Sequence, residues 1–159
     1  MSAAPGNVAA SIRQRLANLA RESGDDFEQV LVRYALERLL YRLSVSRHAD
    51  SLVLKGALLF RLWINLQQRP TRDADFLGFG AADAKSIQTM FSELGEMKVA
   101  PDDGLVFDAS SVRAEEIRQD AGYPGVRVNM QATLARARIL GLTLPVKAWA
   151  QIRLAAACG

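Results

Sequence analysis

The feature that most constrains the fold of this chain is a glycine turn that precedes two aspartates at alternate positions. The apolar run 52–54 ends at Lys55-Gly56, and residues 57–66 then have the composition of a buried helix. After the breakers Arg69-Pro70, the segment 73–77 (Asp-Ala-Asp-Phe-Leu) alternates in the manner of a strand. The order strand, glycine turn, helix, acidic strand therefore predicts a core that mixes helices with a sheet.

Asp73 and Asp75 are the candidate metal ligands and catalytic carboxylates. Residues i and i+2 of a strand face the same way, so the two carboxylates are expected side by side on one face. Two such groups repel each other unless a cation lies between them, and hard oxygen ligands suit Mg²⁺. Because Mg²⁺ keeps positions for water and substrate phosphates, the pair indicates phosphoryl-type chemistry.

Lys55 and Gly56 form the candidate phosphate site. A strand that passes through Gly56 straight into a helix leaves free backbone N–H groups at the helix N-terminus, and glycine lets a phosphate approach the backbone closely. Each feature alone has a simpler explanation, such as a solvated strand end for the aspartates, a tight turn for Gly56 and solvation for Arg69 and Arg72. The combination favours a site for phosphate and metal.

The chain begins with two helical patterns without proline or interior glycine. Apolar residues recur at three- and four-residue spacing over 8–22, and Gly24 ends this helix. Asp25, with Glu28 three positions later, resembles a capping box that opens a second helix running to about Ser46. We expect both helices to precede the core.

The remainder predicts one more helix and several short strands. Residues 87–94 have a helical pattern that Gly95 ends, and Asp102-Asp103-Gly104 is a turn signal. The predicted strands after this turn are 105–107, 111–117, 126–132 and 138–144. The fold class is therefore α+β, with a mixed sheet flanked by helices and preceded by two N-terminal helices.

Composition narrows the class of protein and its compartment. The 159 residues correspond to one domain, and the single Cys and single His argue against a zinc site. No apolar run reaches the ~20 residues that span a bilayer, and no secretion signal opens the chain, so we expect a cytoplasmic protein without membrane contact. Residues 121–159 hold five Lys or Arg and no Asp or Glu, against a net charge of +3 for the whole chain. The basic excess therefore belongs to the C-terminal part.

Several ordered segments resemble one known family. The glycine turn, helix and Asp-x-Asp strand are similar to the nucleotidyltransferase core of the DNA polymerase β type. More narrowly, the chain resembles the AbiEii/AbiGii nucleotidyltransferase toxins of abortive-infection and type IV toxin–antitoxin systems. The matching segments are 34–44, 54–60, 69–76, 103–105 and 123–128, within a resemblance that runs over about residues 11–140.

The resemblance implies transfer of a nucleotidyl group from an NTP to an acceptor, expected to be an RNA such as tRNA, with Mg²⁺ as the cofactor. Asp73 and Asp75 would hold the metal ions, and the backbone of Gly56 and Ala57 would cradle the triphosphate. The side chains expected to neutralise or orient phosphates are Lys55, Thr71 and Arg72. A cognate antitoxin would be the protein partner.

The sequence departs from the family where a third carboxylate is needed. Relatives carry it after the Gly-Val-Arg-Val strand, whereas no Asp or Glu follows Asp120 here. Two accounts compete: Asp108, Glu115 or Glu116 substitutes from a neighbouring strand, or the chain is a truncated or frameshifted member. We favour the second, which divides the chain into a helical segment (1–48) packed on the core, a nucleotidyltransferase core (49–140) and a divergent tail (141–159). The sequence leaves enzymatic activity open, and turnover is expected to be severely weakened.

Two functions from other classes are the alternatives. A nucleic-acid-binding remnant would use the arginines of the first two helices, although acids interleave with them and a solvated face explains them better. A second remnant would bind an antitoxin without catalysis. His48 is expected at the surface and has no predicted role. The arginines in question are Arg13, Arg15, Arg21, Arg38 and Arg42.

Overall fold

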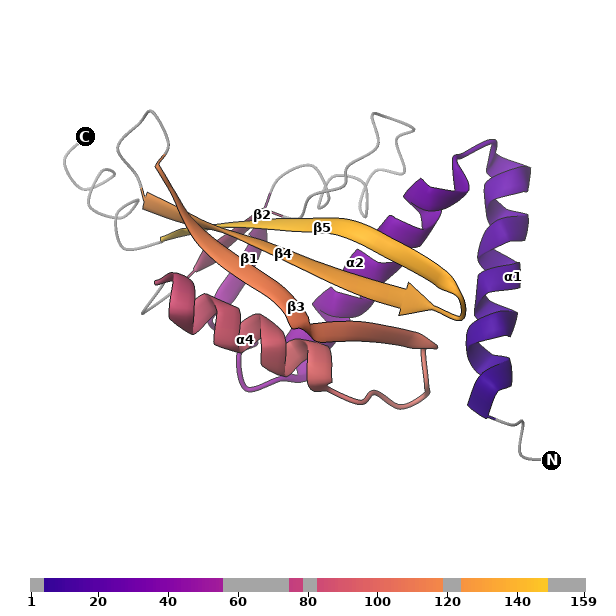
Figure 1. Cartoon of the computed structure of the whole chain (residues 1–159), viewed down its shortest axis with the longest axis horizontal. Helices are drawn as coiled ribbons and strands as arrows, with labels where there is room; N and C mark the ends of the chain where they lie inside the picture. Colours follow the sequence, from indigo (N-terminus) through magenta and orange to yellow (C-terminus); the bar gives the residue numbers. More distant parts are fainter. Residues whose placement is uncertain (1–4, 56–74, 79–82, 119–123, 149–159) are drawn as a thin grey trace.

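The computed structural model describes residues 5–55, 75–78, 83–118 and 124–148. In chain order the elements are α1 (Pro5–Ser23), α2 (Phe27–Val45), β1 (Leu52–Lys55), β2 (Asp75–Gly78), α4 (Ala84–Glu96), β3 (Leu105–Arg118), β4 (Pro124–Leu134) and β5 (Ala137–Ala148) (Figure 1). None of the described helices is long and apolar enough to span a membrane.

The five strands form one mixed sheet with the order β1-β2-β5-β4-β3. β2 and β5 run parallel, whereas the pairs β1–β2, β4–β5 and β3–β4 are antiparallel. The parallel pair brings β2 beside a strand that comes some sixty residues later in the chain, so β2 lies between β1 and β5. The predicted α+β class with a mixed sheet is confirmed.

The core lies between the sheet and two helices. α2 and α4 contact each other, and both contact the sheet, so they share one of its faces. Along β4, Val126, Val128 and Met130 are buried in this core, while Arg127 and Gln131 are exposed between and beyond them. The period of two thus gives the sheet one apolar face under the helices and one polar face.

The two N-terminal helices form as the periodicity predicts, with one correction at the start of α2. Gly24 has a positive φ of 73°, as expected for a glycine that ends a helix. The N-cap of α2 is Asp26, not Asp25, because the Asp26 side chain accepts a hydrogen bond from the Gln29 N–H at 3.2 Å. Asp25 instead accepts from the Ser23 hydroxyl at 2.9 Å and so belongs to the turn.

The strands are longer than predicted, and the predicted strands 105–107 and 111–117 form the single strand β3. β3 runs without interruption from 105 to 118, with an irregularity in its pairing between Asp108 and Arg113. Here Ser110 N–H donates to the Asp108 carboxylate at 3.0 Å, and Gln131 N–H on β4 donates to the Ser111 hydroxyl at 2.9 Å. These side chains satisfy backbone groups that the bulge would otherwise leave unpaired.

β5 also crosses the predicted boundary between core and tail. The strand spans Ala137–Ala148, and Leu142, Leu144 and Val146 are each no more than 1% exposed. Residues 141–148 are therefore part of the central sheet, and the predicted boundary at residue 140 falls inside this strand. Residues 149–159 lie outside the described part of the chain.

Candidate functional site

The predicted site is represented in the described part of the chain by Lys55 and Asp75. They are register partners at the joined ends of two antiparallel strands, because Lys55 is the last residue of β1 and Asp75 is the first of β2. The end of β1, one residue before Gly56, therefore lies beside the second aspartate of the acidic pair. The other predicted site residues lie outside the described residues: Gly56, Ala57, Thr71, Arg72 and Asp73.

The backbone register shows which residues of the other strands lie at the same level as Lys55 and Asp75. Phe76 pairs with Val146 of β5, Val146 with Val126 of β4, and Val126 with Glu116 of β3. One residue along each strand, the neighbours are Lys55, Asp75, Pro145, Arg127 and Glu115, which we call the Asp75 row. Within this row Arg127 pairs directly with both Pro145 and Glu115.

The strand next to β2 lacks a carboxylate. β5 is the parallel neighbour of β2 and contains no Asp or Glu over its twelve residues. The parallel register begins with Phe76 opposite Val146, and its continuation by one residue puts Pro145 at the level of Asp75. Among the described residues, no group of three or more His, Cys, Asp or Glu side chains is close enough to hold a metal ion.

The proposed substitute ligands lie too far away. Asp108, Glu115 and Glu116 belong to β3, which β5 and β4 separate from β2. Three strand spacings amount to about 14 Å between backbones, whereas ligands of one Mg²⁺ lie about 2.1 Å from the ion. The strand order therefore speaks against the first of the two accounts, because β3 does not neighbour β2.

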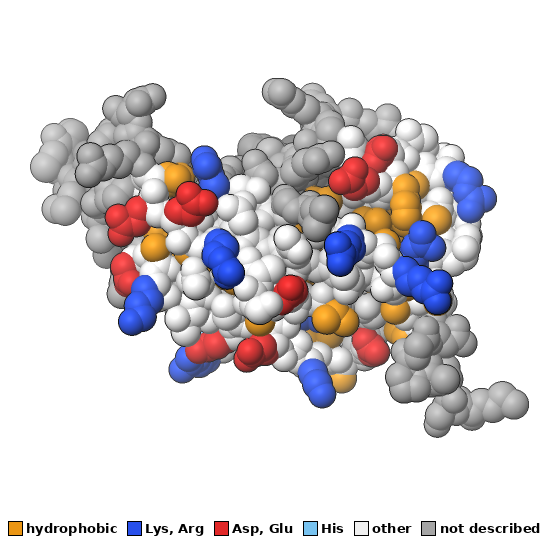
Figure 2. All heavy atoms as spheres, in the orientation of Figure 1, with side chains coloured by type: hydrophobic (Ala, Val, Ile, Leu, Met, Phe, Trp, Pro, Cys, Tyr) orange, Lys and Arg blue, Asp and Glu red, His pale blue; other side chains and the backbone are white. Residues whose placement is uncertain are grey.

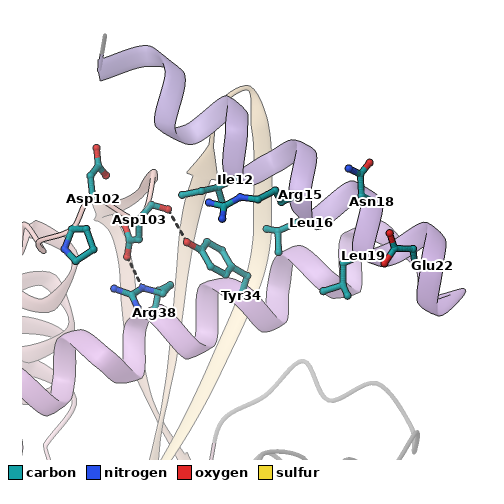
Figure 3. Close-up of a pocket in the computed structure, with 11 residues that line it drawn as sticks. Ile12, Arg15, Leu16, Asn18, Leu19, Glu22, Tyr34, Arg38, Asp102 and Asp103 are labelled. Atoms are coloured by element: carbon teal, nitrogen blue, oxygen red, sulfur yellow. Dashed lines mark hydrogen bonds and ion pairs between the residues drawn. The ribbon is translucent and has the colours of Figure 1, made fainter. Parts of the chain in front are cut away.

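A buried ion-pair cluster, which the prediction did not include, joins α2 to the turn before β3 (Figure 3). Arg42 donates to both Asp103 carboxylate oxygens, at 2.7 and 3.1 Å, and Arg38 Nε donates to one of them at 2.9 Å. The Tyr34 hydroxyl donates to the Asp103 backbone carbonyl at 2.9 Å. The Arg42 guanidinium also lies 4.8 Å from the centroid of the Phe107 ring. We call this cluster the Asp103 anchor.

The charges of the Asp103 anchor stabilise one another in a desolvated setting. The side chains of Arg42 and Asp103 are only 3% and 4% exposed. Burial opposes ionisation of Asp103, but hydrogen bonds from Arg42 and Arg38 outweigh it and hold the pKa of the carboxyl below its usual range. Burial, together with the Asp103 charge, raises the pKa of Tyr34, so its hydroxyl remains a donor.

The Asp103 anchor also explains two motif segments and gives two of the five candidate nucleic-acid-binding arginines a structural role. The segments 34–44 and 103–105, both part of the family resemblance, meet here although 61 positions separate Arg42 from Asp103. Arg38 and Arg42 serve this contact and do not form a basic stripe. On the face shown in Figure 2, basic and acidic side chains are interspersed, which does not match a broad nucleic-acid footprint. In the sequence, the signal that could have indicated this ion-pair cluster was the four-residue spacing of Arg38 and Arg42 on one helix.

A groove of about 600 Å³ lies beside the Asp103 anchor, between α1, α2 and the turn at 101–103 (Figure 3). Its apolar part comes from Ile12, Leu16 and Leu19 of α1 with Tyr34 of α2. None of the described residues that line it belongs to β1, β2 or β5. The groove is therefore separate from the Asp75 row.

His48 is not the free surface residue that the sequence suggested. Its Nε2 lies 2.7 Å from a Glu93 oxygen, and its side chain is 16% exposed. Arg47 binds the same carboxylate through two contacts, at 2.5 and 3.1 Å. Hydrogen bonds from Arg47 and His48 lower the pKa of Glu93. This cluster connects the turn after α2 to α4, and within the described residues it forms no hydrogen bond or ion pair with the Asp75 row.

The comparisons with known proteins support one family. The family model described as nucleotidyl transferase AbiEii toxin, type IV TA system, matches residues 38–145, which is more than half of the chain. No curated protein matches the sequence. The match begins at Arg38 of the Asp103 anchor, includes the stretch between β1 and β2, and ends in β5. The chain belongs to the AbiEii family of nucleotidyl transferase toxins.

Proposed function

We propose that the chain binds an NTP at the Asp75 row and transfers its nucleotidyl group, with Mg²⁺, to an RNA acceptor such as tRNA. The family assignment supplies the reaction type and a toxin–antitoxin setting with a cognate antitoxin. The observation that carries the location is the register pair Lys55–Asp75, which brings the start of the glycine turn beside the acidic strand.

The burial of Phe76 indicates which face of the sheet the neighbouring site residues occupy. Phe76 is 1% exposed and packs against Phe91 of α4, with ring centroids 6.2 Å apart. Since strand residues alternate, we expect Asp73 and Asp75 on the opposite, polar face of the sheet, and we propose that the nucleotide binds there. Backbone N–H groups at Gly56 and Ala57 would bind the triphosphate. The side chains proposed to position phosphates are Lys55, Thr71 and Arg72.

The reaction is an in-line displacement at the α-phosphate. An acceptor hydroxyl forms the new P–O bond, the bond to pyrophosphate breaks, and the hydroxyl proton leaves to solvent. Mg²⁺, when bound, would stabilise the charge that develops on the attacking and leaving oxygens. Asp73 and Asp75 are the carboxylates proposed to hold it, and β5 supplies none. We therefore expect slow turnover.

The direct test is incubation of the full chain with each α-labelled NTP, Mg²⁺ and total tRNA. We expect weak incorporation by the wild type that Asp75→Asn abolishes, because the substitution removes a proposed metal ligand with little change in size. Denaturation midpoints of the two proteins check that Asp75→Asn still folds. Failure of all four nucleotides to label RNA, or equal labelling by both proteins, would contradict the proposal.

One observation favours a second function, that of a protein that binds its antitoxin without catalysis. β5 keeps its buried apolar positions while lacking the carboxylate that metal-dependent transfer needs. The combined substitution Asp73→Asn and Asp75→Asn distinguishes the two functions. A non-catalytic role predicts unchanged antitoxin binding and an unchanged growth phenotype. The catalytic role predicts that the variant loses any toxicity of the wild type.

A further inference from the structure

We propose that Arg127 binds a phosphate group of the nucleotide held at the Asp75 row. This inference rests on the proposed function and adds a binding residue that lies outside the Gly56 and Asp-x-Asp segments. It is carried by the position of Arg127 in the sheet, by its exposure and by the contacts of its neighbours.

Arg127 occupies the polar face of the sheet in line with the acidic strand. Its neighbours Val126 and Val128 are 3% and 0% exposed and point into the core, whereas Arg127 is exposed. Its register partner on β5 is Pro145, the position beside Asp75. Arg127 is therefore the first cationic position in the Asp75 row on the β5 side of Asp75.

The distance between Asp75 and Arg127 suits a phosphate group that binds between them. Two strand spacings place the backbones of Asp75 and Arg127 about 10 Å apart. An extended arginine side chain covers much of that distance, and a triphosphate bound at the acidic strand covers the remainder. The guanidinium fork binds phosphate oxygens in a bidentate manner, which a lysine ammonium does not reproduce. With Lys55 on the other side of Asp75, the row would place cationic residues on both sides of the acidic pair.

The contacts of the described residues leave Arg127 available. The arginines that form ion pairs there are Arg38, Arg42 and Arg47. Arg113, on the neighbouring strand, donates to the backbone oxygens of Ser110 and Val112. Arg127 makes no such contact within the described part of the chain, although Glu115 is its cross-strand partner.

A purely structural role for Arg127 makes a different prediction. If its purpose were to pair with Glu115 across the strands, Arg127→Gln and Glu115→Gln would destabilise the fold alike and leave nucleotide affinity unchanged. If it binds phosphate, Glu115→Gln removes a nearby negative charge and raises nucleotide affinity, opposite to the effect of Arg127→Gln. The two variants together therefore separate the roles.

The experiment measures binding of ATP, GTP, CTP and UTP to the full chain, in Mg²⁺ and again in EDTA. We expect Arg127→Gln to weaken binding of the preferred triphosphate about ten-fold under both conditions, because the contact does not require the metal. Arg127→Lys should weaken binding of the triphosphate less than Arg127→Gln does. The matched control is Arg138→Gln, an exposed arginine that pairs with Thr133 at the far end of β5 and should change affinity less than two-fold, a bound of about 0.4 kcal/mol.

The outcomes separate this inference from the function on which it rests. If the wild type binds a triphosphate and Arg127→Gln binds it equally well, the inference is wrong while the proposed function stands. If the wild type binds none of the four nucleotides, both fail. Equal losses in Arg127→Gln and Arg138→Gln would indicate general electrostatic attraction and would also overturn the assignment of Arg127.

Discussion

The Asp103 anchor and the Asp75 row are two charged regions of the same protein, and they differ in completeness. In the Asp103 anchor, the buried carboxylate has its arginine partners and also accepts the Leu105 N–H at 3.2 Å. In the Asp75 row, the parallel neighbour strand β5 contains no Asp or Glu. The comparison teaches that the buried charges joining α2 to the turn before β3 are paired, whereas the strand beside β2 contributes no acidic residue.

The largest predicted effect is the loss of Arg42 from the Asp103 anchor. Arg42→Ala leaves the Asp103 carboxylate buried with Arg38 as its remaining cationic partner, so we expect a loss of about 3 kcal/mol in the free energy of unfolding. Urea denaturation measures it. The control is Arg38→Ala, whose side chain is 26% exposed and should cost about 1 kcal/mol. Equal and small losses would show that the anchor is not needed for stability.

A second effect concerns the backbone next to the anchor. Gly104 has a φ of 72°, and a Cβ there would lie 2.8 Å from the Ala9 Cα of α1. Gly104→Ala therefore combines backbone strain with a clash, and we expect a loss of about 2 kcal/mol in urea denaturation. Gly24→Ala shares the positive φ but meets nothing within 4 Å, so it should cost about half as much. A larger loss for Gly24→Ala would contradict the contact between α1 and the turn.

The third effect is a pH dependence of the Asp103 anchor. Hydrogen bonds from the arginines depress the pKa of Asp103 in the folded protein. Its contribution to stability is therefore present above the unfolded value of about 3.9 and is lost as the pH falls through the folded value. The wild type should exceed Asp103→Asn in unfolding free energy near pH 7, and the difference should shrink below about pH 4. A difference that grows on acidification would refute this assignment.

The smallest effect concerns the exposed cluster between α2 and α4. Glu93→Gln removes the partner of Arg47 and His48, and screening by solvent limits the consequence. We expect a slightly lower melting temperature at low ionic strength that returns to the wild-type value at about 1 M salt. A loss that persists at high salt would mean that this cluster is a second anchor.

Much of the fold followed from periodicity, because helices and half-buried strands repeat apolar residues at fixed spacings. The differences arose where side chains act on the local backbone. Asp26 rather than Asp25 caps α2, and the serines after Asp108 join two predicted strands into β3. Neither outcome is encoded in hydrophobic spacing, since both depend on which hydroxyl or carboxylate reaches a particular N–H group.

The sequence predicts which residue types make up the candidate site, but it does not predict how the strands arrange them. Residue types and spacing predict the acidic strand and the glycine turn, but the pairing of Asp75 with Lys55 and its alignment with Arg127 depend on strand order. The same order excludes Glu115 as a metal ligand, although it is a plausible candidate in the sequence. Sequence distance carries no information about which strand becomes the parallel partner of β2.

We attribute the slow turnover expected of this protein to β5, which provides no carboxylate beside Asp75. Nucleotidyl incorporation by Pro145→Asp tests this claim, with Pro145→Asn as a control of matched size and backbone. We predict slow incorporation by the wild type and Pro145→Asn, and an increase of at least about ten-fold for Pro145→Asp. Rapid incorporation by the wild type, or equal rates for the two variants, would contradict the claim.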